Sequence, residues 1–153
     1  MPINAIPIFP PTVILKPDDS LLDTLKLMLS KQINHAPICD GDGVFIGLIC
    51  TNAILRALIP ASAKAEGGLS DLKFVGDGIR LLSSHLRDLD RLKVVEFANN
   101  DLPVLHEDSP ILEATLKLAE SAAPLPVVGK DGKLLGVISR RALLAYLLAQ
   151  QGN

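Results

Sequence analysis

Aromatic side chains are scarce in this sequence. Phe, Tyr and Trp make up 3% of its 153 residues, and Trp does not occur at all. Proteins that hold single-stranded nucleic acid stack the bases on aromatic side chains, so the chain lacks the surface for that kind of binding. Apolar residues nevertheless make up 48% of the sequence, and the core must therefore consist of Leu, Ile, Val and Ala.

An excess of positive charge and a long apolar segment are also missing. The formal net charge is −2, so no basic field attracts nucleic acid or an anionic membrane. No apolar run approaches the ~20 residues that span a bilayer. Residues 1–11 contain neither the basic nor the long apolar region of a signal peptide. We therefore expect a cytoplasmic protein with no nucleic-acid partner and no direct membrane insertion.

Metal-binding and catalytic patterns are absent as well. The two cysteines, Cys39 and Cys50, lie in apolar stretches without the spacing of a metal knuckle, and we expect two buried, reduced thiols. The histidines show no HExxH or Cys/His spacing, and no GxSxG, P-loop or Rossmann glycine pattern occurs. These absences predict a protein that is not an enzyme and holds no metal and no covalently bound cofactor.

The most informative feature that is present is an internal repeat. Residues 12–58 align on residues 101–147 without a gap, at an offset of 89, and 12 of the 47 aligned positions are identical. A period of this length is too long for a solenoid and indicates two small units in tandem. The identical pairs are Asp19/Asp108, Ser20/Ser109, Leu27/Leu116, Leu29/Leu118, Pro37/Pro126, Asp42/Asp131, Gly43/Gly132, Gly47/Gly136, Ile49/Ile138, Ala53/Ala142, Leu55/Leu144 and Leu58/Leu147.

Each copy contains the same series of local signals, which predicts the order β-α-β-β-α twice. A short β-prone run precedes a helix, and an apolar strand then leads through an Asp-Gly turn into a second strand and a last helix. In the first copy we expect these elements at 12–16, after Ser20, and at 36–39, 44–50 and 52–58. In the second copy we expect them at 102–105, after Ser109, and at 125–128, 133–139 and 141–148.

Serine and glycine positions refine this prediction. Ser20 and Ser109 are expected to cap the first helix of each copy, with Pro110 at the first helical position. Gly47 and Gly136 interrupt the second hairpin strand at equivalent points, which predicts a bend or a close approach of two backbones.

A longer segment, 59–100, separates the copies. Small and polar residues predict a loop at 60–68, and a short helical turn is expected at 94–98. An amphipathic helix is predicted at 77–92, with an apolar face formed by Ile79, Leu82, Leu86 and Leu89. This helix either docks on the module or faces a partner. The expected division is a first unit at 1–60, an inserted loop and helix at 61–92, and a second unit at 93–150.

Two stretches of the chain, residues 14–58 and 103–148, resemble the cystathionine-β-synthase (CBS) domain. The matching features are the capped helix, the Pro-Ile and Pro-Val strands, the Asp-Gly turn, and the glycine-led strand that enters the last helix. The resemblance implies an α/β (α+β) fold in which two units pack with pseudo-twofold symmetry. It also implies a module that senses AMP, ADP, ATP or another adenosyl ligand in its clefts and regulates an enzyme or transporter.

Members of this family that bind adenosine ligands typically end the glycine-led strand with Gly-x-x-Ser/Thr-x-x-Asp. The resemblance implies a phosphate or ribose contact for the hydroxyl and a ribose contact for the carboxylate. In the first copy these positions hold Cys50 and Ala53, and in the second they hold Ser139 and Ala142. Both ribose-binding carboxylates are therefore missing, which weakens a nucleotide site without excluding one.

The second copy offers a replacement for the lost contact. Arg140 and Arg141 follow Ser139 at the start of a predicted helix, where guanidinium groups and free backbone N–H groups can hold a phosphate. The alternative is that both arginines are merely solvated.

Three further positions complete the candidate ligand set. His35 stands where the family's adenine ring often lies, and it is either a base contact or a structural histidine. Thr51 is either a helix cap or a ligand. Pro126 opens the Pro-Val strand.

Two functions remain open at this stage. The first is a ligand-sensing regulator of a separate enzyme or transporter. The second is a ligand-independent dimerisation or protein-interaction module that has lost nucleotide binding. A homodimer is expected in either case, because a chain this rich in Leu, Ile and Val leaves the outer helix faces partly uncovered.

Overall fold

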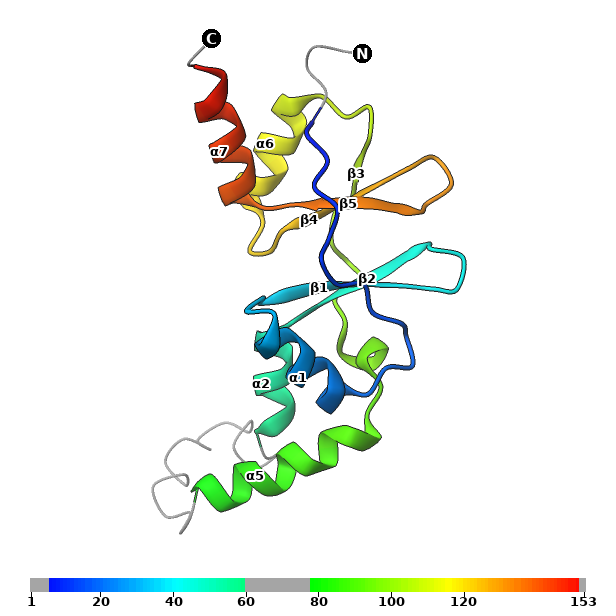
Figure 1. Ribbon diagram of the computed structural model, residues 1–153, viewed down its shortest axis with the longest axis vertical. Coiled ribbons are helices and arrows are strands. Elements are labelled where there is room, and N and C mark those ends of the chain that lie inside the picture. The colour runs from blue at the N-terminus through cyan, green and yellow to red at the C-terminus, as the bar shows by residue number, and fades with distance from the viewer. Residues whose placement is uncertain (1–5, 60–77, 152–153) are drawn as a thin grey trace.

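The computed structural model describes residues 6–59 and 78–151. Figure 1 shows two similar units stacked along the long axis, with their sheets facing each other and their helices on the outer sides. The first unit contains α1 (Leu21–Ser30), β1 (His35–Cys39), β2 (Phe45–Cys50) and α2 (Thr51–Leu58). The second contains β3 (Leu105–His106), α6 (Ile111–Glu120), β4 (Leu125–Val128), β5 (Leu134–Ile138) and α7 (Arg140–Gln150). The predicted order is confirmed, and the first strand of the first copy is reduced to a bridge between Leu15 and Ile38.

The two hairpins form where the Asp-Gly turns predicted them. β1 pairs antiparallel with β2, and β4 pairs antiparallel with β5. Gly43 and Gly132 have φ angles of +85° and +81°, a conformation that glycine adopts without steric cost. In the first turn the carboxylate of Asp40 also accepts hydrogen bonds from two backbone N–H groups of the turn. Local turn chemistry therefore fixes both hairpins.

The first helices of the two copies follow a different offset from the strands. α1 and α6 each have ten residues and start 90 positions apart, whereas Ala36 and Leu125, which hold equivalent places in their hairpins, are 89 positions apart. The second copy is thus one residue shorter between its first helix and the hairpin, and the ungapped alignment is one residue out of register over the first helices, α1 and α6.

This shift corrects the predictions for Ser109, expected as the N-cap, and for Pro110, expected at the first helical position. The N-cap of α6 is Pro110, which forms no side-chain cap, whereas Ser20 caps α1 as expected by accepting the Asp23 N–H at 3.0 Å. Ser109 instead accepts the N–H of His106 at 2.9 Å. Asp19 accepts the N–H of Lys16 in the same way in the first copy.

Two sets of backbone contacts join the units. At the hairpin tips, Phe45 donates to the Gly132 carbonyl and Leu134 to the Gly43 carbonyl, both at 3.0 Å. The N-terminal segment also crosses the second unit, where the Phe9 carbonyl accepts the Val137 N–H at 3.0 Å.

A reciprocal crossing is made by Asn99, which exchanges backbone hydrogen bonds with Leu48 in the first unit. At these crossings a Cβ on Gly136 would lie 2.7 Å from the Phe9 carbonyl oxygen, and one on Gly47 would lie 3.0 Å from that of Asn99. The predicted close approach of two backbones is confirmed at both glycines.

Each unit has its own apolar core, and each core includes a residue from outside its repeat. Met28, Ile38 and Ile49 are fully buried in the first core, together with Leu89 and Val94 from the connecting segment. The second core contains Leu105, Leu125 and Ile138, together with Ile6 from the N-terminal segment. The N-terminal and connecting segments, which pack into these cores from outside the repeats, link the folding of the two units. The division of the chain at 60/61 and 92/93 stays a prediction.

Among the described residues, the connecting helix packs on the first unit through its C-terminal end. It comprises α5 (Gly78–Asp88) and the 3-10 turn η1 (Leu89–Arg91), and a second turn, η2 (Val94–Phe97), follows where a helical turn was expected. Leu89 is buried, whereas Ile79 is 80% exposed. The imidazole of His85 lies 2.9 Å from the Leu58 carbonyl oxygen. The predicted loop at 60–68 lies outside the described residues. Within 6–59 and 78–151, no helix is long and apolar enough to cross a membrane.

Candidate functional site

The junctions between hairpin and last helix differ between the copies. In the second copy Ser139 is the N-cap of α7, and its hydroxyl accepts the N–H of Ala142 at 3.1 Å. In the first copy Cys50 is the N-cap of α2 and makes no side-chain cap. Thr51 begins α2 and donates its backbone N–H to the Asn34 carbonyl at 3.0 Å. Of the two junctions, only the second therefore has a side-chain oxygen that caps the start of its helix.

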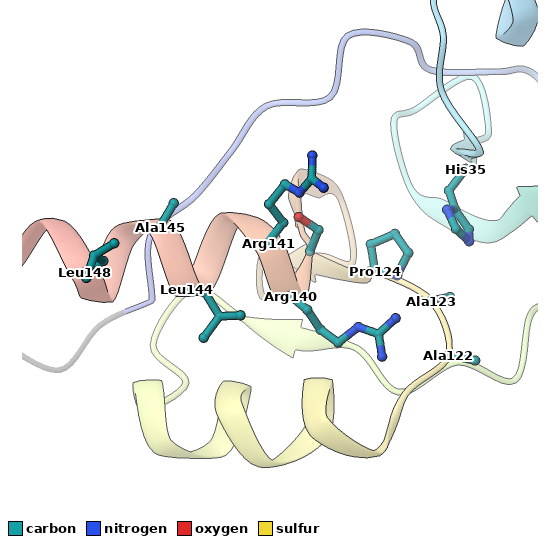
Figure 2. Close-up of a pocket in the computed structure, with 10 residues that line it drawn as sticks. His35, Ala122, Ala123, Pro124, Arg140, Arg141, Leu144, Ala145 and Leu148 are labelled. Atoms are coloured by element: carbon teal, nitrogen blue, oxygen red, sulfur yellow. The ribbon is translucent and has the colours of Figure 1, made fainter.

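A central pocket of about 640 Å3 opens beside this second junction (Figure 2). It is lined by His35, residues 122–124, Ser139, Arg140, Arg141, Leu144, Ala145 and Leu148. Four of the six predicted ligand residues thus meet in one place, although His35 comes from the other copy. Pro126 is buried within β4, and Thr51 does not line this pocket.

The two arginines of the pocket are exposed and point in different directions. Figure 2 shows Arg140 extending toward Ala122 and Ala123, while Arg141 extends from another side of the helix start. Across residues 6–59 and 78–151, neither guanidinium makes an ion pair or a hydrogen bond. Two permanent positive charges therefore stand at the pocket without a partner in the described part of the chain, and they do not form a parallel pair.

His35 forms part of the opposite wall. It is the first residue of β1 and is half-buried, and this burial lowers the pKa of its imidazole below the ordinary value of 6.5. The ring is therefore neutral at pH 7, with one N–H donor and one acceptor nitrogen. A neutral imidazole offers a flat face and a single donor, which suits contact with a base ring.

Two smaller cavities adjoin the central pocket. One, of about 120 Å3, shares His35 and Pro124 with it and is lined by residues that include Val13 and Pro37. The other, of about 540 Å3, shares Ala122 and Ala123 with it and includes Lys117. The turn at 122–124 therefore separates three neighbouring cavities.

Residues 122–124 and the apolar wall on α7 were not singled out from the sequence. The turn at 122–124 holds the place in the second copy that residues 33–35 hold in the first. This equivalence with residues 33–35 is the one sequence feature that indicates a role for the turn. Leu144 and Leu148 carry no local signal for a site, because leucine at helical spacing is equally typical of a core.

The cysteines are free thiols. Cys39 is buried, and this burial raises the pKa of its thiol. The negative charge of the nearby Asp40 carboxylate raises it further, as the smaller of the two causes. Cys50 is half-buried, less than expected. In the described part of the chain, no three His, Cys, Asp or Glu side chains are grouped to hold a metal ion.

Comparison with known proteins identifies both copies. The family model of the CBS domain matches residues 5–60 and 94–149. The chloroplastic CBS domain-containing protein CBSX2 of Arabidopsis thaliana is 28% identical over 131 residues, which cover 83% of this chain and 55% of that protein. A CBS domain-containing protein of Dictyostelium discoideum is 28% identical over 135 residues, 85% of this chain and 81% of that protein.

An uncharacterized 33.4 kDa protein of Thermofilum pendens is 24% identical over 96% of this chain and 46% of its own length. The chain therefore spans about half the length of the Thermofilum and Arabidopsis relatives.

Solved structures agree in fold. The crystal structure of CBSX2 has a TM-score of 0.74 at 21% identity and covers 95% of this chain and 94% of that one. The complex of CBSX2 with AMP has a TM-score of 0.68 at 22% identity, with 94% of each chain covered. The complex of CbpB with c-di-AMP has a TM-score of 0.66 at 14% identity, with 97% of this chain and 84% of that one covered. Since the family model matches well over half of its residues in two segments, the chain belongs to the CBS domain family and is a tandem CBS pair.

Proposed function

We propose that this CBS pair senses an adenine nucleotide, or another adenosyl ligand that carries phosphate, in the central pocket and thereby regulates a separate enzyme or transporter. One observation carries the proposal. The pocket brings His35 of the first copy together with Ser139, Arg140 and Arg141 of the second. A neutral ring and a positively charged helix start therefore face the same cavity. Structures of related fold whose complexes contain AMP and c-di-AMP support the choice of ligand class.

The start of α7 supplies the groups for a phosphate. The backbone N–H groups of the first helical turn point at the pocket end of the helix, and the helix dipole adds partial positive charge there. The hydroxyl of Ser139 accepts the N–H of Ala142 and keeps its own proton to donate to a phosphate oxygen. Arg140 and Arg141 add two permanent charges, and no carboxylate among the described residues pairs with them.

The missing ribose carboxylates shift the balance of binding toward phosphate. Ala53 and Ala142 occupy the positions of the family's acidic residues, and a charged hydrogen bond of that kind contributes about 1.5–3 kcal/mol. Binding that depends on exposed arginines should weaken as salt rises, because charges in solvent are screened over about 8–10 Å at ordinary ionic strength.

Calorimetric titration with AMP tests the proposal. The variant R140A/R141A is expected to lose AMP binding, and adenosine, which lacks the phosphate, is expected to bind the wild type only weakly. The variant R87A/R91A removes the same charge from exposed positions of the connecting segment and is the matched control. Thr51→Ala should barely change the affinity. Unchanged AMP affinity in R140A/R141A would contradict the assignment.

A second function, dimerisation and protein contact without a ligand, is favoured by the outer helix faces. Leu112 is 78% exposed and Leu148 is 71% exposed. Apolar side chains this open usually mark an interface, and we propose a homodimer. Light scattering should therefore give a mass above the 16.3 kDa of one chain at tens of micromolar. A module of this second kind would dimerise and bind no nucleotide.

A further inference from the structure

The side chains around the central pocket are rich in hydrogen-bond donors and poor in acceptors. Arg140 and Arg141 each carry several N–H donors and no acceptor, and the backbone N–H groups at the start of α7 add further donors. Among the described residues that line the pocket, none is Asp, Glu, Asn or Gln. The side-chain acceptors of this lining are the hydroxyl of Ser139, which already accepts the Ala142 N–H, and one nitrogen of His35. The pocket therefore suits a ligand that brings many acceptors and few donors.

A free ribose diol fits such a pocket poorly. Each ribose hydroxyl is a donor that needs an acceptor when it leaves water, and a donor left unpaired weakens binding. A phosphate on the ribose removes that donor and supplies charged acceptor oxygens, which arginine binds strongly. The same contrast separates two kinds of dinucleotide site, in which an acidic residue holds a free ribose hydroxyl and an arginine accommodates a ribose phosphate. The lining of the central pocket thus favours a phosphorylated ribose.

The two guanidinium groups are placed to hold two separate phosphates. Successive residues of an α-helix point about 100° apart, so Arg140 and Arg141 leave α7 in different directions. Figure 2 shows Arg140 extending toward Ala122 and Ala123, and these two small residues also border the neighbouring cavity of about 540 Å3. Space for a phosphate therefore lies beside Arg140. Phosphates joined in one chain leave a nucleoside in a single direction, whereas phosphates on two different ribose oxygens leave it in two.

We propose that the central pocket prefers an adenosine ligand with two separate phosphates, one on the 5′ oxygen and one on the 2′ or 3′ oxygen of the ribose. Arg140 and Arg141 each hold one phosphate. The inference rests on the proposed nucleotide binding and narrows its ligand class. It also makes Ala142 a specificity-determining position, because a carboxylate in this first turn of α7 would repel the ribose phosphate and accept hydrogen bonds from a free diol.

Ligands that differ only in where the phosphates sit test this preference. Calorimetry at fixed salt compares 3′,5′-ADP and 2′,5′-ADP with AMP, with 5′-ADP, which contains the same atoms, and with ATP, which carries about the same charge. At least one of the two bisphosphates should bind about tenfold more tightly than all three 5′ nucleotides, the low end of what one charged hydrogen bond contributes. If neither bisphosphate binds more tightly than 5′-ADP and ATP, the inference is overturned and the proposed function stands. A wild type that binds none of the five ligands would remove the proposed function itself.

Single variants assign the two phosphates to the two arginines. R140A and R141A should each lower the affinity for the preferred bisphosphate about tenfold, whereas only one of them should lower the affinity for AMP, which has one phosphate. Ala142→Asp should weaken bisphosphate binding and strengthen AMP binding. The control is Ala149→Asp, which adds the same charge to the last turn of the same helix and should leave the preference unchanged.

Circular dichroism checks that each of these variants is folded. A reversal of preference in Ala142→Asp cannot come from a general loss of structure, because one ligand gains affinity while the other loses it. A bisphosphate preference that survives Ala142→Asp would overturn the inference. So would arginine variants that both lower the affinities for AMP and the bisphosphate by the same factor, because the two guanidinium groups would then hold a single phosphate.

Discussion

The two copies of this CBS pair have the same backbone at the junction between hairpin and last helix but different side chains. Cys50 and Ser139 both adopt extended φ and ψ angles as N-caps, yet only Ser139 completes a cap. Two arginines follow in the second copy, whereas Thr51 and an asparagine follow in the first. The fold requires the extended backbone and leaves the side chain free, so the chemistry of the two junctions can differ without a change of fold.

A second difference lies in the first helix of each copy. α1 begins with a serine cap and buries Thr24, whose hydroxyl has no hydrogen-bond partner among the described residues. α6 has Pro110 as its N-cap, without a side-chain cap, and has Ala114 at the equivalent buried position. A missing cap and an unpaired buried hydroxyl are each destabilising. Each copy thus tolerates one local defect, because its helix is held mainly by packing.

The largest effect is expected from truncation of equivalent core residues. Met28 and Leu118 occupy the same place in α1 and α6 and are buried. Met28→Ala and Leu118→Ala should each lower the free energy of unfolding by about 2–5 kcal/mol. Both variants should unfold in one transition in urea, followed by circular dichroism, because exchanged segments link the two cores. A separate early transition in either variant would show that the copies unfold independently.

Alanine substitutions at Gly47 and Gly136 compare the two places where a segment from outside a unit crosses that unit's hairpin. Gly136→Ala should lower the free energy of unfolding by about 1–3 kcal/mol. Gly47→Ala should have a smaller effect, because its new Cβ would meet a carbonyl oxygen at 3.0 Å rather than 2.7 Å. Gly41→Ala is the control, since a Cβ there meets nothing within 4 Å. Urea denaturation measures all three, and equal losses in all three would contradict the role of the crossings.

Exchange of the junction side chains tests the difference in capping. Ser139→Ala should cost about 1 kcal/mol, because α7 loses the oxygen that accepts the Ala142 N–H. Cys50→Ser should have the opposite sign and stabilise the protein by up to about 1 kcal/mol, because it supplies the cap that α2 lacks. Thermal unfolding of both variants measures the difference. Destabilisation by Cys50→Ser would show that the thiol is held by packing.

The smallest effect concerns pH. Burial lowers the pKa of His35 in the folded protein below 6.5, so the unfolded chain takes up its proton first as pH falls. The contribution of His35 to stability is therefore complete above about pH 6.5 and is lost as pH falls through the folded pKa. His35→Gln should flatten the fall in stability between pH 7 and pH 5, measured by urea denaturation. An unchanged slope in His35→Gln would contradict the assignment.

The sequence alone determined the order of elements, both hairpins and the close approach at Gly47 and Gly136. These features follow from local rules, because an Asp-Gly turn needs positive φ and a crossing backbone leaves no room for a Cβ. The sequence did not reveal the one-residue shift between the copies. Leucine-rich helices match one another almost equally well in neighbouring registers, so the aligned pair Leu29/Leu118 hid the structural pair Met28/Leu118.

The tertiary structure decided what the candidate site contains. Ser139, Arg140 and Arg141 are consecutive and were visible in the sequence, but the packing of one copy on the other places His35 against residues 122–124. Packing also decides which leucines belong to the core. Leucines at helical spacing indicate an apolar helix face, but the spacing does not say whether that face meets the interior or the solvent. The pocket is therefore a property of the assembled pair, formed by residues far apart in the chain that local sequence rules do not relate.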